Sequence, residues 1–282
     1  MRQPPRITIL AISILVCSSA LAQEGDAVDK DELAAKLSNP TAAVGSMNLF
    51  VDHTKFTGDL AYAAEQSGTT ILFQPALPKP LDIGFNLLIR PAIPIIIDQP
   101  VFKGFDGFES SGVNLGNISF DIALGKTQEN GLLYFFGMVG NAPTATSTEL
   151  RNQWAFGPEL ALGVFKKTFI GGALITQQWG VEEVEEGVDR TNVTGGQYFY
   201  AIPIGSGQVI GAGPTFSYDW NNEQFTLPIG TGYSKTTAIG KTPFKYGIQF
   251  WYYIAQPDLF GPEWMVRIQL TPVIKLPWKA GS

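Results

Sequence analysis

The C-terminal segment from Trp264 to Trp278 alternates so regularly that it restricts the fold of the whole chain. Its even-numbered positions are apolar, whereas most of its odd-numbered positions are polar, among them Arg267, Gln269 and Lys275. Neighbouring side chains of a β-strand point to opposite faces, so the segment predicts a strand with one apolar face bounded by tryptophans. The same alternation is found in residues 84–97, 115–125, 152–166 and 243–255.

The second face of these segments distinguishes two classes of β-protein. A soluble sandwich has an exposed polar face that carries many charges, but here that face is rich in Gly, Ala, Ser, Thr and Asn. Only 16% of the chain is charged, while aromatic residues are abundant, with 19 Phe, 9 Tyr and 6 Trp. Long strands with aromatic-edged apolar faces are typical of lipid contact. We therefore expect an all-β fold, a transmembrane antiparallel up-and-down β-barrel, with a soluble β-sandwich as the alternative.

The N-terminus has the pattern of a secretory signal peptide. A short basic stretch with Arg2 and Arg6 precedes an apolar run, 7–17, that is too short to cross a bilayer as a helix. Ala20-Leu21-Ala22 is a small-x-small cleavage site, so we assign residues 1–22 to the signal peptide. A membrane-anchoring helix is the alternative.

Cleavage after Ala22 would change the chemistry available to the chain. It removes Cys17, the only cysteine, and it changes the net charge from −6 to −8 because Arg2 and Arg6 leave with it. Disulfides and cysteine metal sites are then excluded. An acidic chain is also a poor partner for nucleic acid, whose phosphates require clustered Lys and Arg.

One helix is expected, over residues 26–37. Its first turns are acidic, which suits the helix dipole, and Asn39-Pro40 stops it. We assign residues 23–45 to a periplasmic N-terminal helical segment and residues 46–282 to the outer-membrane β-barrel. Either the segment plugs the lumen or it lies free in the periplasm.

About 12 strands are expected, an even number as in bacterial single-chain barrels. Their approximate spans are 46–54, 69–78, 84–97, 115–125, 131–140, 152–166, 168–179, 196–204, 208–219, 224–234, 243–255 and 262–276. If both termini are periplasmic, the external loops fall near 55–68, 98–114, 141–151, 180–195, 220–223 and 256–261. The first four of these are the long connections, as such barrels require.

Three segments resemble a known family. They are Glu32-Leu33-Ala34-Ala35-Lys36-Leu37-Ser38-Asn39-Pro40, Ile71-Leu72-Phe73-Gln74-Pro75-Ala76-Leu77-Pro78 and Phe85-Asn86-Leu87-Leu88-Ile89-Arg90-Pro91-Ala92-Ile93-Pro94. They are similar to the outer-membrane barrels named for a phenol meta-pathway degradation protein, often labelled "transporter" or "neuromedin U". The resemblance implies a monomeric barrel with a proposed role in the passage of small compounds, aromatic ones among them, and it implies no catalytic residue. Many outer-membrane barrels end in an aromatic residue read by the barrel assembly machinery, whereas here Trp278 is followed by Lys279-Ala280-Gly281-Ser282.

Alternation also predicts which polar side chains face the lumen. A basic residue facing lipid near the midplane costs about 2–4 kcal/mol, which favours an inward position for Arg90, Lys245 and Arg267. The full set of candidate lumen and solute-path residues is Asn48, Asp52, Gln74, Arg90, Asn117, Asp121, Glu159, Lys245, Gln249, Trp251, Arg267 and Gln269.

Two interpretations of this set stay open. The basic residues could pair with Asp121 and Glu159 in a network that fills a modest barrel. Alternatively, they could form a selectivity ring along a pore, in which Trp251 and Tyr253 offer apolar contact to a solute. A barrel of about 12 strands lies between small filled barrels and wide open porins in size, so the number of strands does not decide between the two interpretations.

An acidic loop and a lone histidine are the remaining candidates for function. Glu182, Glu183, Glu185, Glu186 and Asp189 could hold divalent cations against lipopolysaccharide, although a solvated loop is the simpler interpretation. His53 is the single histidine, and no Gly-x-Ser-x-Gly motif, phosphate loop or clustered metal ligands accompany it. We expect no enzyme activity, no cofactor and no metal site.

Three function classes follow. We expect first a channel for small, hydrophobic or aromatic solutes, second a structural or surface-interaction barrel with a filled lumen, and only remotely a lipid-modifying enzyme that uses His53. The expected partners are outer-membrane lipid and lipopolysaccharide, the assembly machinery and a small-molecule solute. We expect the barrel to be a monomer.

Overall fold

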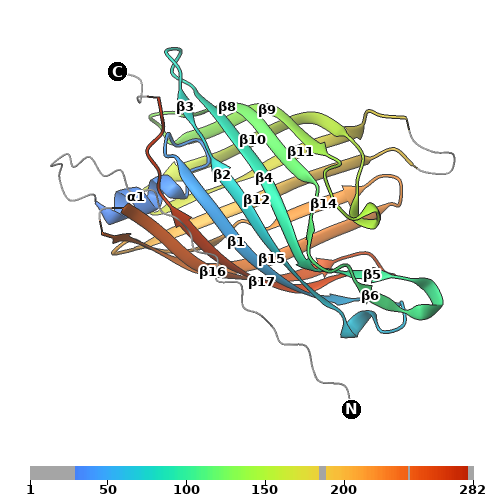
Figure 1. Cartoon of the computed structure of the whole chain (residues 1–282). Coiled ribbons are helices and arrows are strands. Elements are labelled where there is room, and N and C mark those ends of the chain that lie inside the picture. The colour runs from blue at the N-terminus through green and yellow to red at the C-terminus, as the bar shows by residue number, and fades with distance from the viewer. Residues whose placement is uncertain (1–28, 184–188, 241, 279–282) are drawn as a thin grey trace.

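The computed structural model describes residues 29–183, 189–240 and 242–278, and it shows a closed antiparallel β-barrel (Figure 1). The predicted signal peptide, 1–22, lies outside the described residues. The barrel closes where the last strand pairs with the first, as in Asp52↔Arg267 and Leu49↔Leu270. This confirms the predicted all-β barrel fold.

Twelve positions around the wall are occupied by strands, each antiparallel to the next. They are β1 (Ser46–Thr57), β2 (Ser67–Ala76), β4 (Asn86–Asp98), β8 (Ile118–Thr127), β9 (Leu132–Ala142), β10 (Ala155–Lys166), β11 (Phe169–Gly180), β12 (Asn192–Gly205), β13 (Gln208–Ala212) continued by β14 (Thr215–Asp219), β15 (Gln224–Ile239), β16 (Thr242–Ala255) and β17 (Gly261–Pro272).

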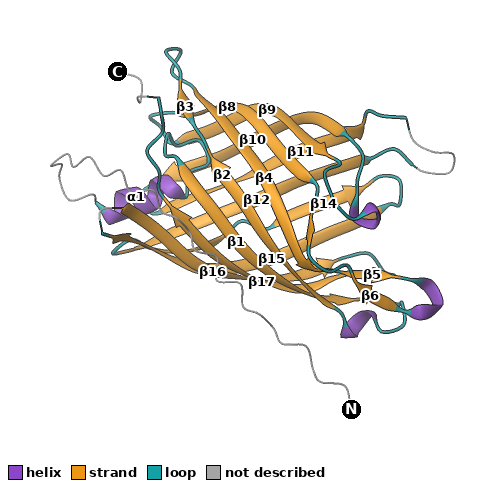
Figure 2. Ribbon diagram, viewed as in Figure 1, coloured by secondary structure: helices purple, strands orange, loops and turns teal. Residues whose placement is uncertain are grey.

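The two ends of the barrel differ. At one end, here called the helix end, the connections are short, and α1 (Lys30–Leu37), the one α-helix among the described residues, lies at the mouth (Figure 2). The opposite end, here called the loop end, carries the longer connections. These contain the remaining short elements: η1 (Ala63–Glu65), β5 (Pro100–Phe102), η2 (Gly104–Asp106), β6 (Phe108–Ser110), β7 (Asn114–Leu115) and η3 (Thr148–Leu150), while β3 (Lys79–Pro80) belongs to the helix end.

The outer face of the wall is an apolar belt. Alternate side chains along each strand are exposed and large, for example Phe136 at 49%, Leu162 at 56% and Ile248 at 52%. Aromatic residues border the belt at both ends: Trp154, Trp179 and Trp220 at the loop end, and Tyr134, Phe169 and Tyr246 at the helix end.

The height of the belt follows from strand geometry. Phe169 and Trp179 lie ten residues apart on β11, which is about 33 Å along a strand. With a strand tilt of about 40°, the two rings are separated by about 25 Å along the barrel axis, the height of the apolar band of outer-membrane barrels.

The strand predicted over 208–219 is interrupted in the structure. β13 pairs with β15 through Gln208–Ile210, and β14 pairs with it through Ser217–Asp219, but the residues between do not join the ladder with β15. Pro214 has no amide hydrogen to donate, which explains a break at this place. The break does not open the barrel, because β12 pairs with both halves.

Pro91 and Pro94 lie in the middle of β4, and the ladder accommodates both. The register between β4 and β2 ends at Phe73↔Ile93, so Pro91 lies beyond it. On the other side, β4 pairs with β8 as far as Ala92 and with β7 from Ile95, so Pro94 falls between the two. Each proline thus occupies a gap in a ladder, where no amide donor is needed.

The N-terminal segment is packed against the barrel. Asp29 caps α1 by accepting a hydrogen bond from the Asp31 backbone N–H at 2.9 Å. Ala34 is buried at 2% exposure among Leu133, Ile170, Ala201 and Val209, which belong to the inner face of the wall. The helix therefore lies in the mouth at the helix end, and the predicted residues 26–28 of the helix lie outside the described residues.

Further contacts hold the chain between α1 and β1. Asn39 donates to the Thr127 hydroxyl at 2.9 Å, and Asn86 donates to the Thr41 carbonyl at 2.8 Å. Thr41 itself is 1% exposed. No helix in the described ranges is long and apolar enough to cross a membrane.

Candidate functional site: the barrel lumen

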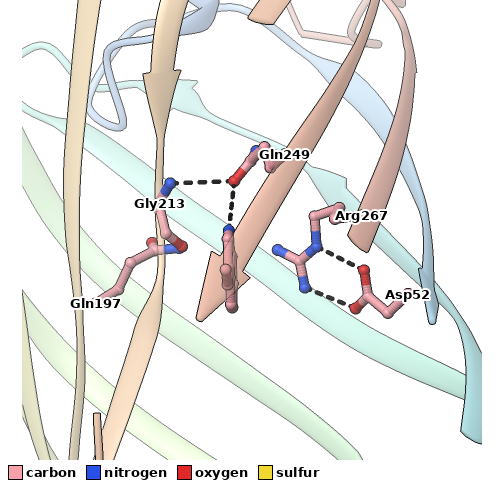
Figure 3. Close-up of polar contacts among 6 residues, drawn as sticks. Asp52, Gln197, Gly213, Gln249 and Arg267 are labelled. Carbon is pink, nitrogen blue, oxygen red and sulfur yellow. Dashed lines mark hydrogen bonds and ion pairs between the residues drawn. The ribbon is translucent and has the colours of Figure 1, made fainter. Parts of the chain in front are cut away.

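The face of the wall opposite the apolar belt carries both polar and apolar side chains, and the predicted residues Arg90, Lys245, Gln249, Arg267 and Gln269 line cavities on it. Two of the basic residues are paired across neighbouring strands. Arg267 of β17 donates from Nε and Nη2 to the two carboxylate oxygens of Asp52 of β1, both at 2.7 Å (Figure 3). The two residues are register partners, so the pair follows directly from the closing of the barrel.

The Arg267 guanidinium is also stacked. Its central carbon lies 4.6 Å from the ring centroid of Phe50 and 4.6 Å from that of Trp251. Trp251 is 1% exposed, so its ring is fixed by its surroundings. A guanidinium that makes a bidentate ion pair and two cation–π contacts has little freedom, and this cluster is a rigid part of the lumen.

Two glutamines hold the broken strand from the inside (Figure 3). Gln249 Oε1 accepts from the Gly213 backbone N–H at 3.3 Å and from the indole N–H of Trp251 at 3.0 Å. Gln197 Nε2 donates to the Gly213 carbonyl at 2.7 Å. The backbone groups that the break between β13 and β14 frees are thereby satisfied from the lumen.

Two tyrosines donate hydrogen bonds to carbonyl groups of β15, the strand on the other side of the same break. Tyr198 donates to the Pro228 carbonyl at 3.0 Å, and Tyr200 donates to the Gly230 carbonyl at 3.1 Å. Both carbonyls belong to the part of β15 that lacks ladder partners in β13 and β14. The wall at this place is therefore held by side chains in place of a backbone ladder.

The second ion pair lies on another part of the wall. Arg90 of β4 donates from Nε to Asp121 of β8 at 2.7 Å, and its guanidinium lies over the Phe135 ring at 5.1 Å. Glu159, at 4% exposure, faces the same region, and its Oε1 has no hydrogen-bond partner among the described residues. This part of the lumen thus contains one base and two acids.

Lys245 differs from both arginines. It is 9% exposed, and no carboxylate of the described residues lies within 4.0 Å of its ammonium nitrogen. In one of the two interpretations of the sequence, Arg90, Lys245 and Arg267 pair with Asp121 and Glu159. In the structure Arg267 pairs with Asp52 instead, because β17 closes against β1, and Lys245 has no such partner.

The remaining predicted residues organise the wall and the loops. Asn48 donates to the Gln74 carbonyl at 2.9 Å and accepts from Thr271 at 3.0 Å, and Gln269 donates to Thr271 at 3.1 Å. Asn117 donates to the Leu150 carbonyl and accepts from the Asn152 backbone N–H at 3.1 Å, so it ties the η3 loop to β8.

Three cavities lie in the lumen between α1 and these polar side chains. Their volumes are about 90, 160 and 190 Å³. Leu37 lines all three. The second is lined by Arg90, Phe135 and Phe199, and the third by Lys245, Arg267 and Gln249.

Glu182, Glu183, Asp189 and His53 line none of the three cavities. Glu182 accepts from the Trp154 backbone N–H at 3.1 Å, while Glu185 and Glu186 lie outside the described residues. In the described part of the chain, no three His, Cys, Asp or Glu side chains are grouped as metal ligands. His53 Nδ1 forms a hydrogen bond with the Thr69 hydroxyl at 3.0 Å.

Alternation along the sequence did not identify the apolar part of the lumen or Gln197. Phe50, Phe135 and Phe199 belong to the inner face, although a rule that reserves large apolar residues for the outer face assigns them outward. Gln197 alternates with Tyr198 and Tyr200, and this alternation could have placed Gln197 on the inner face. Gly213 could not have been found, because its role depends on the break in the wall.

Comparisons with known proteins are consistent with the observed architecture. No protein-family model matches the sequence, and no curated protein matches it. Among solved structures, an outer membrane channel from Pseudomonas putida F1 is similar with a TM-score of 0.63 at 13% identity, covering 89% of this chain and 100% of that one.

Two further structures are more distant. The NanC porin has a TM-score of 0.46 at 12% identity, over 81% of this chain and 100% of that one. Outer membrane phospholipase A from Escherichia coli has a TM-score of 0.45 at 12% identity, over 89% of this chain and 100% of that one. At these identities only the first likeness carries weight, and it shows that this chain has the fold of a known outer membrane channel.

Proposed function

We propose that this protein is an outer-membrane channel through which small, hydrophobic or aromatic solutes pass. The observation that carries the proposal is the contrast between the two faces of one closed wall. The outer face is an apolar belt of about 25 Å bordered by aromatic residues. The inner face contains charged and amide side chains around three cavities.

The lining of the cavities supports the class of solute. Phe135, Leu174 and Phe199 line the second cavity beside Arg90. Binding sites for small organic molecules are mostly apolar, with a few polar groups that fix orientation. This combination suits a solute with an apolar body and one polar group better than it suits a strongly hydrated ion.

A structural barrel with a filled lumen is the second candidate, and one observation favours it. Ala34 packs tightly in the mouth at the helix end, and the lumen above it contains the Arg90–Asp121 and Arg267–Asp52 ion pairs. In this second candidate the helix is a permanent part of the core. In a channel it must move or leave a path beside it.

Conductance of the purified mature chain, refolded in detergent and added to planar bilayers, separates the two candidates. The informative variant is Ala34→Glu, because a carboxylate cannot be accommodated among Leu133, Ile170, Ala201 and Val209. It should release α1 from the mouth and raise the mean single-channel conductance several-fold. Lys30→Glu, on the exposed side of the same helix, is the matched control and should conduct like the unchanged protein.

A barrel that folds but conducts in none of these three forms would contradict the channel and favour the filled barrel. Cell fractionation tests the location separately, since a channel of this kind must be recovered with outer-membrane lipid and lipopolysaccharide. Recovery of the folded chain in the soluble periplasmic fraction would contradict the membrane assignment.

A further inference from the structure

We infer that the third lumen cavity is a binding site for a small monocarboxylate with an apolar body, centred on the Lys245 ammonium. This inference rests on the proposed function, because it specifies the charge and shape of the solute. It concerns a single cavity of about 190 Å³ beside the N-terminal segment.

The charge of the Lys245 ammonium is not balanced within the described chain. Lys245 lines the cavity and is 9% exposed, and among the residues that the structure describes no acidic side chain forms an ion pair with it. An ammonium withdrawn from water and lacking a counter-ion is unfavourable. An anion that enters the cavity would remove this penalty.

Lys245 also lacks hydrogen-bond partners among the described residues. Its register neighbours on the adjacent strands are Thr236 and Thr271. The Thr271 hydroxyl is already used, since it donates to Asn48 and accepts from Gln269. The Thr236 hydroxyl is buried and has no partner among the described residues. A carboxylate in the cavity could accept hydrogen bonds from Lys245 and from the amide of Gln249 or Gln269, which line the same cavity.

The other charges that line the cavity determine the charge of the ligand. Arg267 also lines the cavity, but its bidentate pair with Asp52 already neutralises it. The single positive charge of Lys245 is therefore left to balance. A monoanion balances it, whereas a doubly charged phosphate adds one negative charge too many.

The lining and the volume of the cavity determine the shape of the ligand. Apart from its polar groups, the cavity is lined by Leu37, Phe50, Phe199 and Val209. These apolar side chains would contact the body of the ligand, while Gln197, Gln249 and Gln269, which also line the cavity, are available to its polar end. The volume is below the about 300–1,000 Å³ of typical ligand pockets, so the body must be small.

Calorimetric titration of the refolded mature chain with benzoate tests the site. We expect saturable binding, and benzamide, the neutral analogue of the same shape, should bind at least tenfold more weakly. Benzylammonium should not bind. Inorganic phosphate should also bind at least tenfold more weakly than benzoate. Equal binding of benzoate and benzamide, or preference for phosphate, would overturn the inference without any variant.

Substitutions then locate the site. Lys245→Met keeps the length of the side chain and removes its charge, and it should weaken benzoate binding at least tenfold. Lys245→Arg should retain most of the binding. The matched control is Lys235→Met, because Lys235 lies on the neighbouring β15 and is paired with the outward-facing Tyr246. Unchanged binding in Lys245→Met, or equal losses in Lys245→Met and Lys235→Met, would refute the assignment.

The outcome can be separated from that of the proposed function. Lys245-dependent binding to a barrel that never conducts would support this site and refute the channel. A conducting barrel that binds no benzoate would support the channel and refute this site.

Discussion

The ion pair that closes the barrel allows the sharpest test of the energetics. Asp52→Ala removes the only carboxylate paired with Arg267 in the described chain, and with it two hydrogen bonds of 2.7 Å. The side chains of Arg267 and Asp52 are 12% and 13% exposed, so solvent screens the pair weakly. The substitution leaves a nearly buried guanidinium without its partner.

The magnitude follows from these contacts. Each hydrogen bond to a charged group contributes about 1.5–3 kcal/mol, and breaking a buried ion pair costs about 3–5 kcal/mol. Arg267 keeps its contacts with Phe50 and Trp251, each about 0.5–2 kcal/mol, so these are not lost. We therefore expect Asp52→Ala to lower the free energy of unfolding by about 3 kcal/mol.

Equilibrium unfolding in urea, with the barrel in phospholipid vesicles and tryptophan fluorescence as the signal, measures this change. Asp121→Ala is the comparison, because Arg90 forms one hydrogen bond with Asp121 and Glu159 lies in the same region to replace it. It should cost about 1–2 kcal/mol. Adding Arg267→Met to Asp52→Ala should restore part of the loss, since no buried charge then remains unpaired.

A loss below about 1 kcal/mol in Asp52→Ala would refute this reasoning. So would a double variant whose loss equals the sum of the two single losses, because it would show that the two side chains are energetically independent.

Two further predictions concern other parts of the wall. Tyr200→Phe should lower the free energy of unfolding by about 1–2 kcal/mol, because the Gly230 carbonyl loses its hydrogen bond from Tyr200 where β15 has no ladder with β13 or β14. The outward-facing Tyr246→Phe is the control, and a similar loss in both would contradict the role given to Tyr200. Glu159→Gln should stabilise the barrel by up to about 1 kcal/mol, since it removes one of two acids that share Arg90. Urea unfolding measures it, and a loss of more than about 1 kcal/mol would show that the Glu159 charge is needed.

Much of the wall could be read from alternation because lipid contact requires it. The strands predicted at 84–97 and 243–255 are observed as Asn86–Asp98 and Thr242–Ala255. Prediction was poorer where the outer face is not apolar. The β12 strand begins at Asn192 and not at 196, because Asn192 to Gly195 contain little apolar alternation and are held by pairing with β14.

The prolines show a different limit. Pro91 and Pro94 interrupt the donor pattern of β4, and the sequence alone offers no reason why a sheet tolerates them. The reason lies in the neighbours, since β2 leaves a gap beside Pro91 and the change from β8 to β7 leaves one beside Pro94.

The sequence by itself determined that the chain alternates, how many strands it offers, and which side chains of a strand share a face. These properties are local, because they depend on residues two positions apart. Only the tertiary structure decided which charges meet. Arg267 and Asp52 are separated by most of the chain and become partners because the last strand closes on the first. Lys245 has no carboxylate beside it in the described chain, because the register places threonines there. The position of α1 in the mouth was likewise decided by packing, since the helix has an apolar residue to bury and the lumen has the space to receive it.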